Sequence, residues 1–270
     1  MDSRKKPAPA ILPSRDICLF VDVDGTLIEF ADSPAEVRVS AGLIDTLQRL
    51  HASLDGALAL VSGRSIVDLD RLLYPLKLPT AGLHGMERRD AAGKIWRAHV
   101  PSAALANGRT ELSALAASHP GLLLEDKHAS LALHYRRVPH LMGLARAAVA
   151  RVAAPLVPEF ELLDGDMVVE IKPANLNKAT AVDAFMVERP FVGRIPVFVG
   201  DDITDYRGFG AVRRYEGRTV AVGDRVEAQW YLPDPAAARA WLAAIAMAGV
   251  VDSSSRSTDS GREPRELDLV

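Results

Sequence analysis

Short runs of apolar residues recur along the chain, and three of them contain no polar residue at all. These runs are Ile17–Val21, Ala57–Val61 and Val197–Val199. A strand that is buried on both faces of a parallel sheet has this uninterrupted apolar pattern, whereas a half-exposed strand alternates. We therefore predict three central strands of a parallel sheet at these positions.

Amphipathic segments separate the apolar runs. After Ser40, a suitable helix cap, the apolar residues Leu43, Ile44, Leu47 and Leu50 share one helical face. A second helix is expected over residues 66–73, a further strand over 219–222 and a closing helix over 236–248, all from the same kind of pattern. Strand and helix alternating at this spacing indicate βαβ units, so the predicted fold class is α/β with an open parallel sheet.

The middle of the chain has a different pattern. Two helices are expected over residues 105–117 and 141–152, a strand over 130–136, and a hairpin of 160–163 with 167–171 that turns at 164–166. Strands with helices on one side indicate a small α+β domain inserted into the sheet domain. The predicted organisation is a core of residues 15–101 and 172–251 with a cap domain at 102–171.

The two ends of the chain have polar sequences. Residues 1–14 contain prolines and basic residues but no long apolar stretch, and we expect a flexible arm there. Residues 252–270 are rich in Ser, Arg, Asp and Glu, which predicts a disordered tail.

Composition narrows the possible partners. The 270 residues are 49% apolar and 25% charged, and the formal net charge is -3, so the chain has no overall positive field to hold nucleic acid or an anionic membrane. Cys18 is the single cysteine, and no apolar run is long enough to cross a bilayer. These features favour a soluble, cytoplasmic protein that binds neither nucleic acid nor membrane.

Polar residues follow each of the three central strands. The first strand ends in Asp22-Val23-Asp24-Gly25-Thr26, the second in Ser62-Gly63-Arg64 and the third in Gly200-Asp201-Asp202-Ile203-Thr204-Asp205. A lysine, Lys178, precedes the third strand. Open α/β sheets bind ligands at the carboxyl ends of their strands, so we expect these groups to form one site.

Phosphoryl transfer is the chemistry that this set of residues can carry out. Asp22 and Asp201 form an oxygen-rich site suited to Mg²⁺, while Lys178 and Ser62 can hold phosphate oxygens. Asp22 can accept the phosphoryl group as a nucleophile. Asp24 can act as general acid and base, a role that requires a carboxyl pKa raised by like-charged neighbours.

Each group alone has an ordinary structural explanation. Asp-x-Asp-Gly is usually a turn, Ser-Gly after a strand is common turn chemistry, acids often begin helices, and a lysine is usually exposed. The order in which all four occur, with three at strand ends, favours the catalytic interpretation.

That order resembles the haloacid dehalogenase-like (HAD) superfamily, whose signature is Asp-x-Asp-Gly-Thr, then Ser, Lys and Gly-Asp-Asp-x-x-Asp. Further motifs are similar to those of its trehalose-6-phosphate phosphatase branch: Val61-Ser62-Gly63-Arg64, Gly82-Leu83-His84-Gly85, Leu131-Ala132-Leu133-His134-Tyr135-Arg136 and Val168-Val169-Glu170-Ile171-Lys172-Pro173. The resemblance covers residues 17–222. It implies a Rossmann-like parallel-sheet core with an inserted cap domain of the C2 type.

The resemblance also implies roles for individual residues. Asp22 would be the nucleophile and Asp24 the acid and base, with Mg²⁺ bound by Asp22, the Asp24 carbonyl and Asp201 and supported by Asp205. The transferring phosphoryl group would be held by Ser62 and Lys178. The substrate-binding residues would be Arg64, His84, Glu125, Lys127, Arg136 and Glu170. The remaining histidines, among them His128 and His134, lack the spacing of a metal site.

Three positions depart from the branch and keep alternatives open. Asp166 stands where the branch usually has Lys, and we expect it on the same strand face as Glu170. Tyr206 stands where the branch usually has Glu, near the metal, and Ala179 where it usually has Gly. The expected activity is hydrolysis of trehalose 6-phosphate in trehalose biosynthesis. The alternatives are a phosphatase for sucrose phosphate or mannosylglycerate phosphate, and a non-catalytic protein that binds a sugar phosphate as a sensor or as a subunit of a synthase complex. Association with a trehalose-6-phosphate synthase is a further expectation.

Overall fold

The apolar runs form the centre of a large sheet. The computed structural model describes residues 7–10, 16–29, 37–98, 102–127 and 129–256, and in it the larger sheet has the order β12-β11-β10-β1-β2-β3-β4-β5. All neighbours are parallel except β4 and β5, which continue the sheet as antiparallel strands. The bounds are β1 Ile17–Val21, β2 Leu58–Val61, β3 Thr80–Gly82, β4 Glu87–Arg89, β5 Ile95–Arg97, β10 Ile195–Gly200, β11 Arg218–Val222 and β12 Trp230–Leu232.

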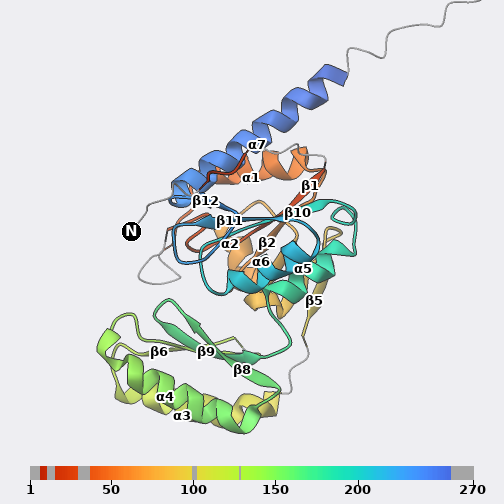
Figure 1. Cartoon of the computed structure of the whole chain (residues 1–270). Coiled ribbons are helices and arrows are strands. Elements are labelled where there is room, and N and C mark those ends of the chain that lie inside the picture. Colours follow the sequence, from red (N-terminus) through yellow and green to blue (C-terminus); the bar gives the residue numbers. More distant parts are fainter. Residues whose placement is uncertain (1–6, 11–15, 30–36, 99–101, 128, 257–270) are drawn as a thin grey trace, which may run out of the picture.

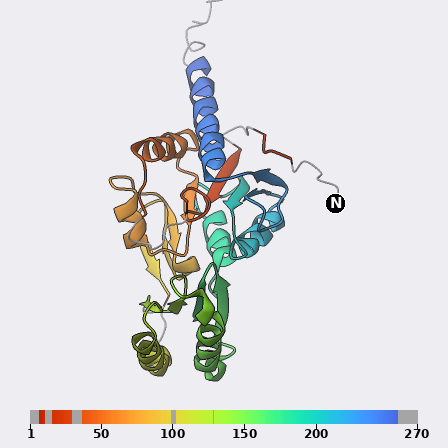
Figure 2. The same cartoon turned by 90° about the vertical axis from the view of Figure 1, so that its left-hand side faces the viewer.

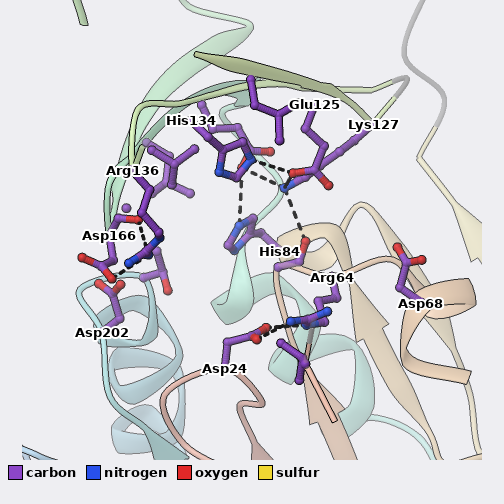
Figure 3. A pocket seen from close by; sticks show the side chains of 18 of the residues that line it. Asp24, Arg64, Asp68, His84, Glu125, Lys127, His134, Arg136, Asp166 and Asp202 are labelled. Carbon is purple, nitrogen blue, oxygen red and sulfur yellow. Dashed lines mark hydrogen bonds and ion pairs between the residues drawn. The ribbon is translucent and has the colours of Figure 1, made fainter. Parts of the chain in front are cut away.

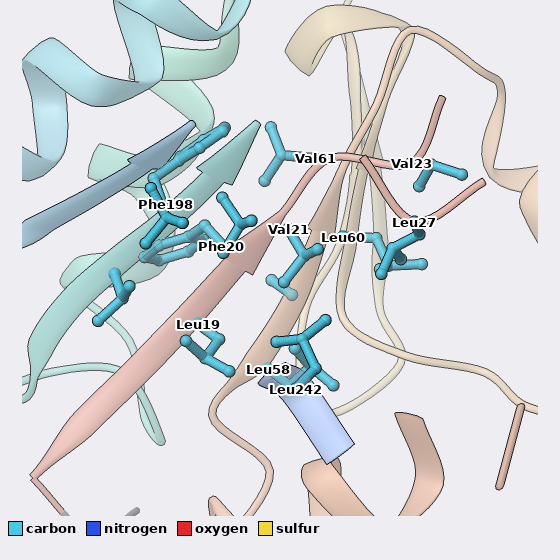
Figure 4. Packing of buried hydrophobic residues seen from close by; sticks show 14 of the residues in the cluster. Leu19, Phe20, Val21, Val23, Leu27, Leu58, Leu60, Val61, Phe198 and Leu242 are labelled. Carbon is cyan, nitrogen blue, oxygen red and sulfur yellow. The ribbon is translucent and has the colours of Figure 1, made fainter. Parts of the chain in front are cut away.

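Strand β1 lies between β10 and β2, and all of its residues are buried. Leu19, Phe20 and Val21 pack with Phe198 and other apolar residues from both neighbouring strands (Figure 4). Phe20 also stacks on Phe191, with ring centroids 5.5 Å apart. The strand is covered on both faces, which is the reason its sequence contains no polar residue.

Helices cover both faces of this sheet. Helices α1 (Ala41–Ser53) and α7 (Pro235–Arg256) lie together on one side, and α5 (Lys178–Met186) and α6 (Asp205–Arg214) on the other (Figure 1). The Ser40 hydroxyl caps α1 by accepting the Leu43 N–H, as predicted. The short helix α2 (Ile66–Leu72) is capped in the same way by Ser65. We refer to this sheet and its helices as the core.

A second, antiparallel sheet has the order β6-β7-β9-β8, and we refer to it and its two helices as the cap. Its strands are β6 Leu123–Asp126, β7 Leu131–His134, β8 Phe160–Gly165 and β9 Val168–Pro173, and its helices are α3 Ala106–Ser118 and α4 Met142–Ala153. The helices lie on the side of the cap sheet that faces away from the core (Figures 1 and 2).

Alternation along the cap strands separates an apolar face from a polar one. Leu131, Leu133, Val169 and Ile171 are buried in an apolar cluster with residues of both cap helices. In the register of the sheet, Glu125 lies opposite Ala132, and Ala132 lies opposite Glu170. Because side chains alternate along a strand, these residues share the face turned toward the core.

The chain ends differ from the sequence-based expectation. Helix α7 continues to Arg256, five residues past the expected core boundary, because residues 252–256 extend a helix that is already formed.

Part of the expected flexible N-terminal arm is bound to the core: the Tyr231 N–H donates to the Pro7 carbonyl, and Trp241 Nε1 donates to the Ala10 carbonyl. Strand β12 is an edge strand, so its backbone groups are open to such a partner. Residues 1–6, 11–14 and 257–270 lie outside the described residues.

No helix in the described part of the chain combines the length and apolar character required to span a bilayer.

Candidate active site

Two neighbouring strands bring their terminal aspartates together. Asp22 follows β1 and Asp201 follows β10, and these strands pair in register up to Val21 and Val199. Asp205 begins α6 just beyond. Carboxylate oxygens of Asp22, Asp201 and Asp205 all lie within 4.8 Å of one another, and all three side chains are buried.

Lys178 joins this group from α5. Its Nζ lies 2.9 Å from Asp22 Oδ1 and 2.6 Å from Asp205 Oδ1, and the residue is only 2% exposed. Asn177 caps the helix in a reciprocal capping box with Thr180. This capping box fixes the first turn of helix α5, and the Lys178 side chain is therefore directed at the carboxylates.

Asp205 also shapes the loop that carries Asp201. Its Oδ2 accepts the backbone N–H groups of Asp201 (3.0 Å) and Asp202 (3.1 Å). A side chain on Gly200 would place its Cβ 2.3 Å from Asp205 Cγ, so the motif requires glycine there. The Thr26 hydroxyl donates to Asp201 Oδ1 at 3.1 Å, a role that sequence reasoning did not assign to Thr26.

The three carboxylates leave an excess of buried negative charge around one lysine. Burial, and then Asp205, raise the pKa of Asp22 well above its ordinary value. Burial, and again Asp205, raise the pKa of Asp201 to about 7. Burial alone would lower the pKa of Lys178, but Asp205 and Asp22 outweigh it and hold that pKa above its usual range. A further positive charge at this position would stabilise the ionised carboxylates.

These donors fit a hard divalent cation. Carboxylate oxygens on fixed strand ends are the ligands that Mg²⁺ takes, usually together with waters and substrate oxygens. Gly25 leaves room beside them, since a Cβ at this residue (φ +79°) would lie 2.3 Å from Asp201 Oδ2.

Asp24 is paired with a cation, which corrects the expectation of like-charged neighbours. Arg64 Nε donates to Asp24 Oδ2 at 2.7 Å, and Arg64 Nη2 to Oδ1 at 2.6 Å. The acidic neighbours lie around Asp22 and Asp201 instead. The loop after β1 turns Asp24 away from that cluster and toward the residues that follow β2.

Ser62 is fully buried at the end of β2. Its hydroxyl oxygen accepts the Arg64 backbone N–H at 3.1 Å. The hydroxyl still has a hydrogen that it can donate to a ligand.

Glu170 of β9 is buried at the centre of a polar cluster. Its neighbours His84 and Lys127 lie close together in Figure 3, on the cap side of Asp24 and Arg64. Glu170 accepts a hydrogen bond from the Ser130 hydroxyl (2.5 Å) and pairs with Lys127 Nζ (3.2 Å), while His84 Nε2 lies 3.6 Å away. Burial raises the pKa of Glu170, but Lys127, His84 and Ser130 outweigh it and hold that pKa well below its usual range. Lys127 also reaches the core at the Gly63 carbonyl (3.5 Å).

Two more polar pairs line the cap face. His134 Nε2 lies 2.9 Å from Glu125 Oε2, and His134 lines the same cavity, although we did not place it among the expected substrate-binding residues. Arg136 donates to the Asp166 carbonyl (3.0 Å) and carboxylate (2.8 Å). The expectation that Asp166 shares a strand face with Glu170 is wrong, because Asp166 lies in the turn between β8 and β9.

The other two departures from the branch lie outside the carboxylate cluster. Tyr206 is 48% exposed, and its ring lies 5.9 Å from the Arg213 guanidinium carbon. The Tyr206 side chain is thus turned toward solvent, and it is not among the residues that line the cavity. Ala179 packs against the apolar core. His128 lies outside the described residues.

His84 sits between core and cap on a strained turn. Leu83, His84 and Gly85 have consecutive positive φ angles of 49°, 57° and 103°. Non-glycine residues in this conformation cluster at functional sites. Burial lowers the pKa of His84, which favours neutral imidazole, and its Nδ1 is the one buried side-chain polar atom without a hydrogen-bond partner among the described residues.

A cavity of about 970 Å³ connects these groups. Asp22, Asp24 and Lys178 line its core end, and the cap contributes Glu125, Lys127, Arg136 and Glu170. Arg64 and His84 line it as well. Asp22, Asp24 and a polar cap face thus line one cavity, which suits a phosphorylated ligand rich in hydroxyl groups.

Comparisons with known proteins agree with this geometry. Residues 20–231 match the family model described as trehalose-phosphatase. The chain is 42% identical over 230 residues to the trehalose-6-phosphate phosphatase of Escherichia coli (strain K12), covering 85% of this chain and 86% of that protein.

Solved structures share the fold. One is a trehalose-6-phosphate phosphatase related protein (TM-score 0.71, 25% identity, 87% of this chain and 99% of the other). Another is BT1666 of Bacteroides thetaiotaomicron, a phosphatase of the HAD superfamily (TM-score 0.61, 18% identity, 92% and 100%). The α/β core with its inserted cap is therefore the HAD-like fold, as predicted. The chain belongs to the trehalose-phosphatase family and is a phosphatase enzyme.

Proposed function

We propose that this chain hydrolyses trehalose 6-phosphate to trehalose and inorganic phosphate in trehalose biosynthesis. The observation that carries the proposal is one cavity that Asp22 and Lys178 line at its core end and polar cap side chains line at the other, with Asp201 and Asp205 clustered beside Asp22. The E. coli relative named for this substrate, 42% identical, supports the assignment.

We propose Mg²⁺ as the cofactor. Asp22, Asp201 and the Asp24 carbonyl would hold it, with Asp205 supporting Asp201 through the loop backbone. When bound, the ion would offset the repulsion between Asp22 and the phosphate and polarise a phosphoryl oxygen.

In the first half-reaction, an Asp22 carboxylate oxygen attacks phosphorus and the bond from phosphorus to the sugar oxygen breaks. The departing sugar oxygen takes a proton from Asp24, and an aspartyl-phosphate remains on Asp22. Lys178 and Ser62 hold the transferring group. In this structure both carboxylate oxygens of Asp24 accept hydrogen bonds from Arg64. To act as an acid, Asp24 must therefore lose one of these two hydrogen bonds when substrate enters.

In the second half-reaction, Asp24 takes a proton from a water molecule. The water oxygen attacks phosphorus, the acyl-phosphate bond breaks, and Asp22 returns as a carboxylate with release of phosphate. The cap excludes bulk water from the cavity during these steps.

The cap would select the sugar. Glu125 and Glu170 can accept from sugar hydroxyls, and Lys127 and Arg136 can donate to them. We propose that Arg64 and the neutral His84 complete this binding set from the core side.

A phosphatase for another sugar phosphate, such as sucrose phosphate or mannosylglycerate phosphate, is the second candidate. The observation that favours it is Asp166, which holds Arg136 at the cap wall where the branch usually has a lysine. The non-catalytic sensor is not supported, since the chain belongs to a phosphatase family and keeps Asp22, Asp24 and Asp201. Cytoplasmic location and association with a synthase stay predictions.

The test is phosphate release from a panel of sugar phosphates, with Mg²⁺ and with a chelator. We expect the highest kcat/KM for trehalose 6-phosphate, no turnover after chelation, and none for Asp22→Asn. A preference for a different sugar phosphate would replace the substrate and leave the chemistry intact. Turnover by Asp22→Asn equal to wild type would overturn the mechanism.

A further inference from the structure

A second charged cluster, formed by Glu161, Lys172 and Arg207, links the cap to the core away from the catalytic carboxylates. Glu161 of β8 lies opposite Lys172 of β9, with Lys172 Nζ 2.9 Å from its Oε1. Both guanidinium Nη atoms of Arg207, on core helix α6, donate to the two oxygens of Glu161 at 2.8 Å. Strand β8 of the cap lies below α5 and α6 of the core (Figure 1). One cap carboxylate therefore binds a cap lysine and a core arginine at the same time.

Lys172 also fixes the chain segment that leaves the cap. The residue is 1% exposed, and its Nζ donates to the Pro173 carbonyl (3.0 Å) and to the Leu176 carbonyl. This segment ends at Asn177, whose side chain caps the N-terminus of helix α5, and the next residue is Lys178. The ammonium that holds Glu161 thus also holds the link between the cap and the phosphate-binding lysine.

On the core side, Arg207 also lies close to the catalytic residues in the sequence. It lies two residues after Asp205, which contacts Lys178 at 2.6 Å. A cavity of about 260 Å³ lies between cap and core here, lined by Lys172, Arg207 and Lys178 among others. Beside this cavity, the Glu161–Arg207 ion pair is a direct contact between cap strand β8 and core helix α6.

The two halves of the cluster differ in strength. Lys172 and Glu161 face each other on paired strands inside the cap, and this pair is largely buried. The Arg207 side chain is 46% exposed, and ion pairs that are open to solvent contribute little to stability. The pair that crosses from cap to core is therefore the one that can break and re-form without unfolding either part.

We propose that Glu161, Lys172 and Arg207 form a latch that holds the cap over the catalytic carboxylates. Lys172 keeps Glu161 in place, and Arg207 is the positioning residue that engages it when the cap is closed. The proposal rests on the proposed function, because closure matters for a substrate that the cap must grip. It assigns no chemical role to these three residues.

The test compares two substrates in Arg207→Gln. p-Nitrophenyl phosphate reports the core chemistry without sugar contacts, and trehalose 6-phosphate requires the closed cap. We expect kcat/KM for the sugar phosphate to fall about tenfold, chiefly through KM, with p-nitrophenyl phosphate turnover unchanged. Glu161→Gln should produce the same loss, and the double variant should lose no more than either single one.

The matched control is Arg214→Gln. Arg214 lies on the same helix, is 56% exposed and pairs with Asp183 at 2.7 Å, but this pair lies within the core. We expect it to change neither activity. An equal loss for Arg207→Gln and Arg214→Gln, equal losses on the two substrates, or no loss for Arg207→Gln would overturn the latch.

A readout independent of activity separates the latch from the substrate assignment. Cys18 is buried, and burial raises the pKa of its thiol to about 12, so it will resist labelling. Cysteines introduced at the exposed residues Val67 of the core and Leu144 of the cap can then carry a fluorescent donor and acceptor. We expect a broader distance distribution in Arg207→Gln than in wild type, and an unchanged one would contradict the latch. Wild type that hydrolyses p-nitrophenyl phosphate but not trehalose 6-phosphate would overturn only the proposed substrate.

Discussion

Lys178 Nζ lies 2.9 Å from Oδ1 of Asp22, although 156 positions separate the two residues in the sequence. The contact joins the end of β1 to the first turn of α5. It holds the expected nucleophile beside a positive charge in a buried site, where electrostatic effects are stronger than in water.

Lys178→Met should reduce kcat by about 10²–10³-fold, the usual loss when one electrostatic stabiliser of a transition state is removed. Steady-state kinetics with saturating Mg²⁺ measure it. Lys94→Met is the control, since Lys94 lies over the exposed Trp96 ring and outside the cavity. A loss smaller than fivefold would contradict the role of Lys178.

Asp201→Asn should have opposite effects on the metal-free and the metal-bound protein. Removing one of three crowded carboxylates relieves repulsion, so we expect the metal-free Tm to rise by about 2–4 °C, the change that corresponds to 1 kcal/mol. Mg²⁺ should raise the Tm of wild type and leave that of the variant unchanged. Thermal unfolding with chelator and with Mg²⁺ tests both statements, and an undiminished Mg²⁺ response in the variant would exclude Asp201 as a ligand.

Gly25→Ala and Gly93→Ala form a matched pair. Both glycines have positive φ, +79° and +85°. A Cβ on Gly25 would lie 2.3 Å from Asp201 Oδ2, whereas one on Gly93 meets nothing within 4 Å. We expect Gly93→Ala to lose about 1 kcal/mol of stability and no activity, and Gly25→Ala to lose the Mg²⁺-dependent Tm shift and most turnover. Equal activities in the two variants would show that the Asp201 position is not critical.

His84→Asn and His84→Gln distinguish the two ring nitrogens. The shorter amide of Asn reaches the position of Nδ1, the atom without a partner, and the longer Gln reaches that of Nε2, which faces Glu170. If Nδ1 binds substrate, His84→Asn should retain most of the wild-type kcat/KM for the sugar phosphate, and His84→Gln should have a kcat/KM about tenfold lower. The reverse order would assign the main role to the Glu170 contact.

Glu170→Gln should show a pH-dependent loss of stability. The folded-state pKa of Glu170 lies below its ordinary value of 4.5, so its ionised form contributes stability above pH 4.5, and this contribution is lost as the pH falls. We expect the variant to be about 3 kcal/mol less stable than wild type at pH 7, because Lys127 loses its buried partner. Denaturant unfolding between pH 7 and pH 3 should show this difference shrinking below pH 4.5. A constant difference over that range would contradict the buried ion pair.

The sequence by itself determined the central parallel strands of the large sheet and the polar residues that follow them. Strands β1, β2 and β10 are visible as uninterrupted apolar runs because burial on both faces excludes polar residues, and Asp22 and Asp201 are recognisable because they follow those runs directly. The short strands β3 to β6 were not predicted, since three or four residues carry too little periodicity to distinguish a strand from a loop.

Only the tertiary structure decided which side chains meet. The pairs Arg64–Asp24, His134–Glu125 and Arg207–Glu161 join residues on separate elements, and their contact depends on strand order, register and the direction of each turn. Local sequence fixes the period of a strand or helix, but long-range packing fixes its neighbours, which is why the partner of Asp24 was expected to be acidic and is an arginine.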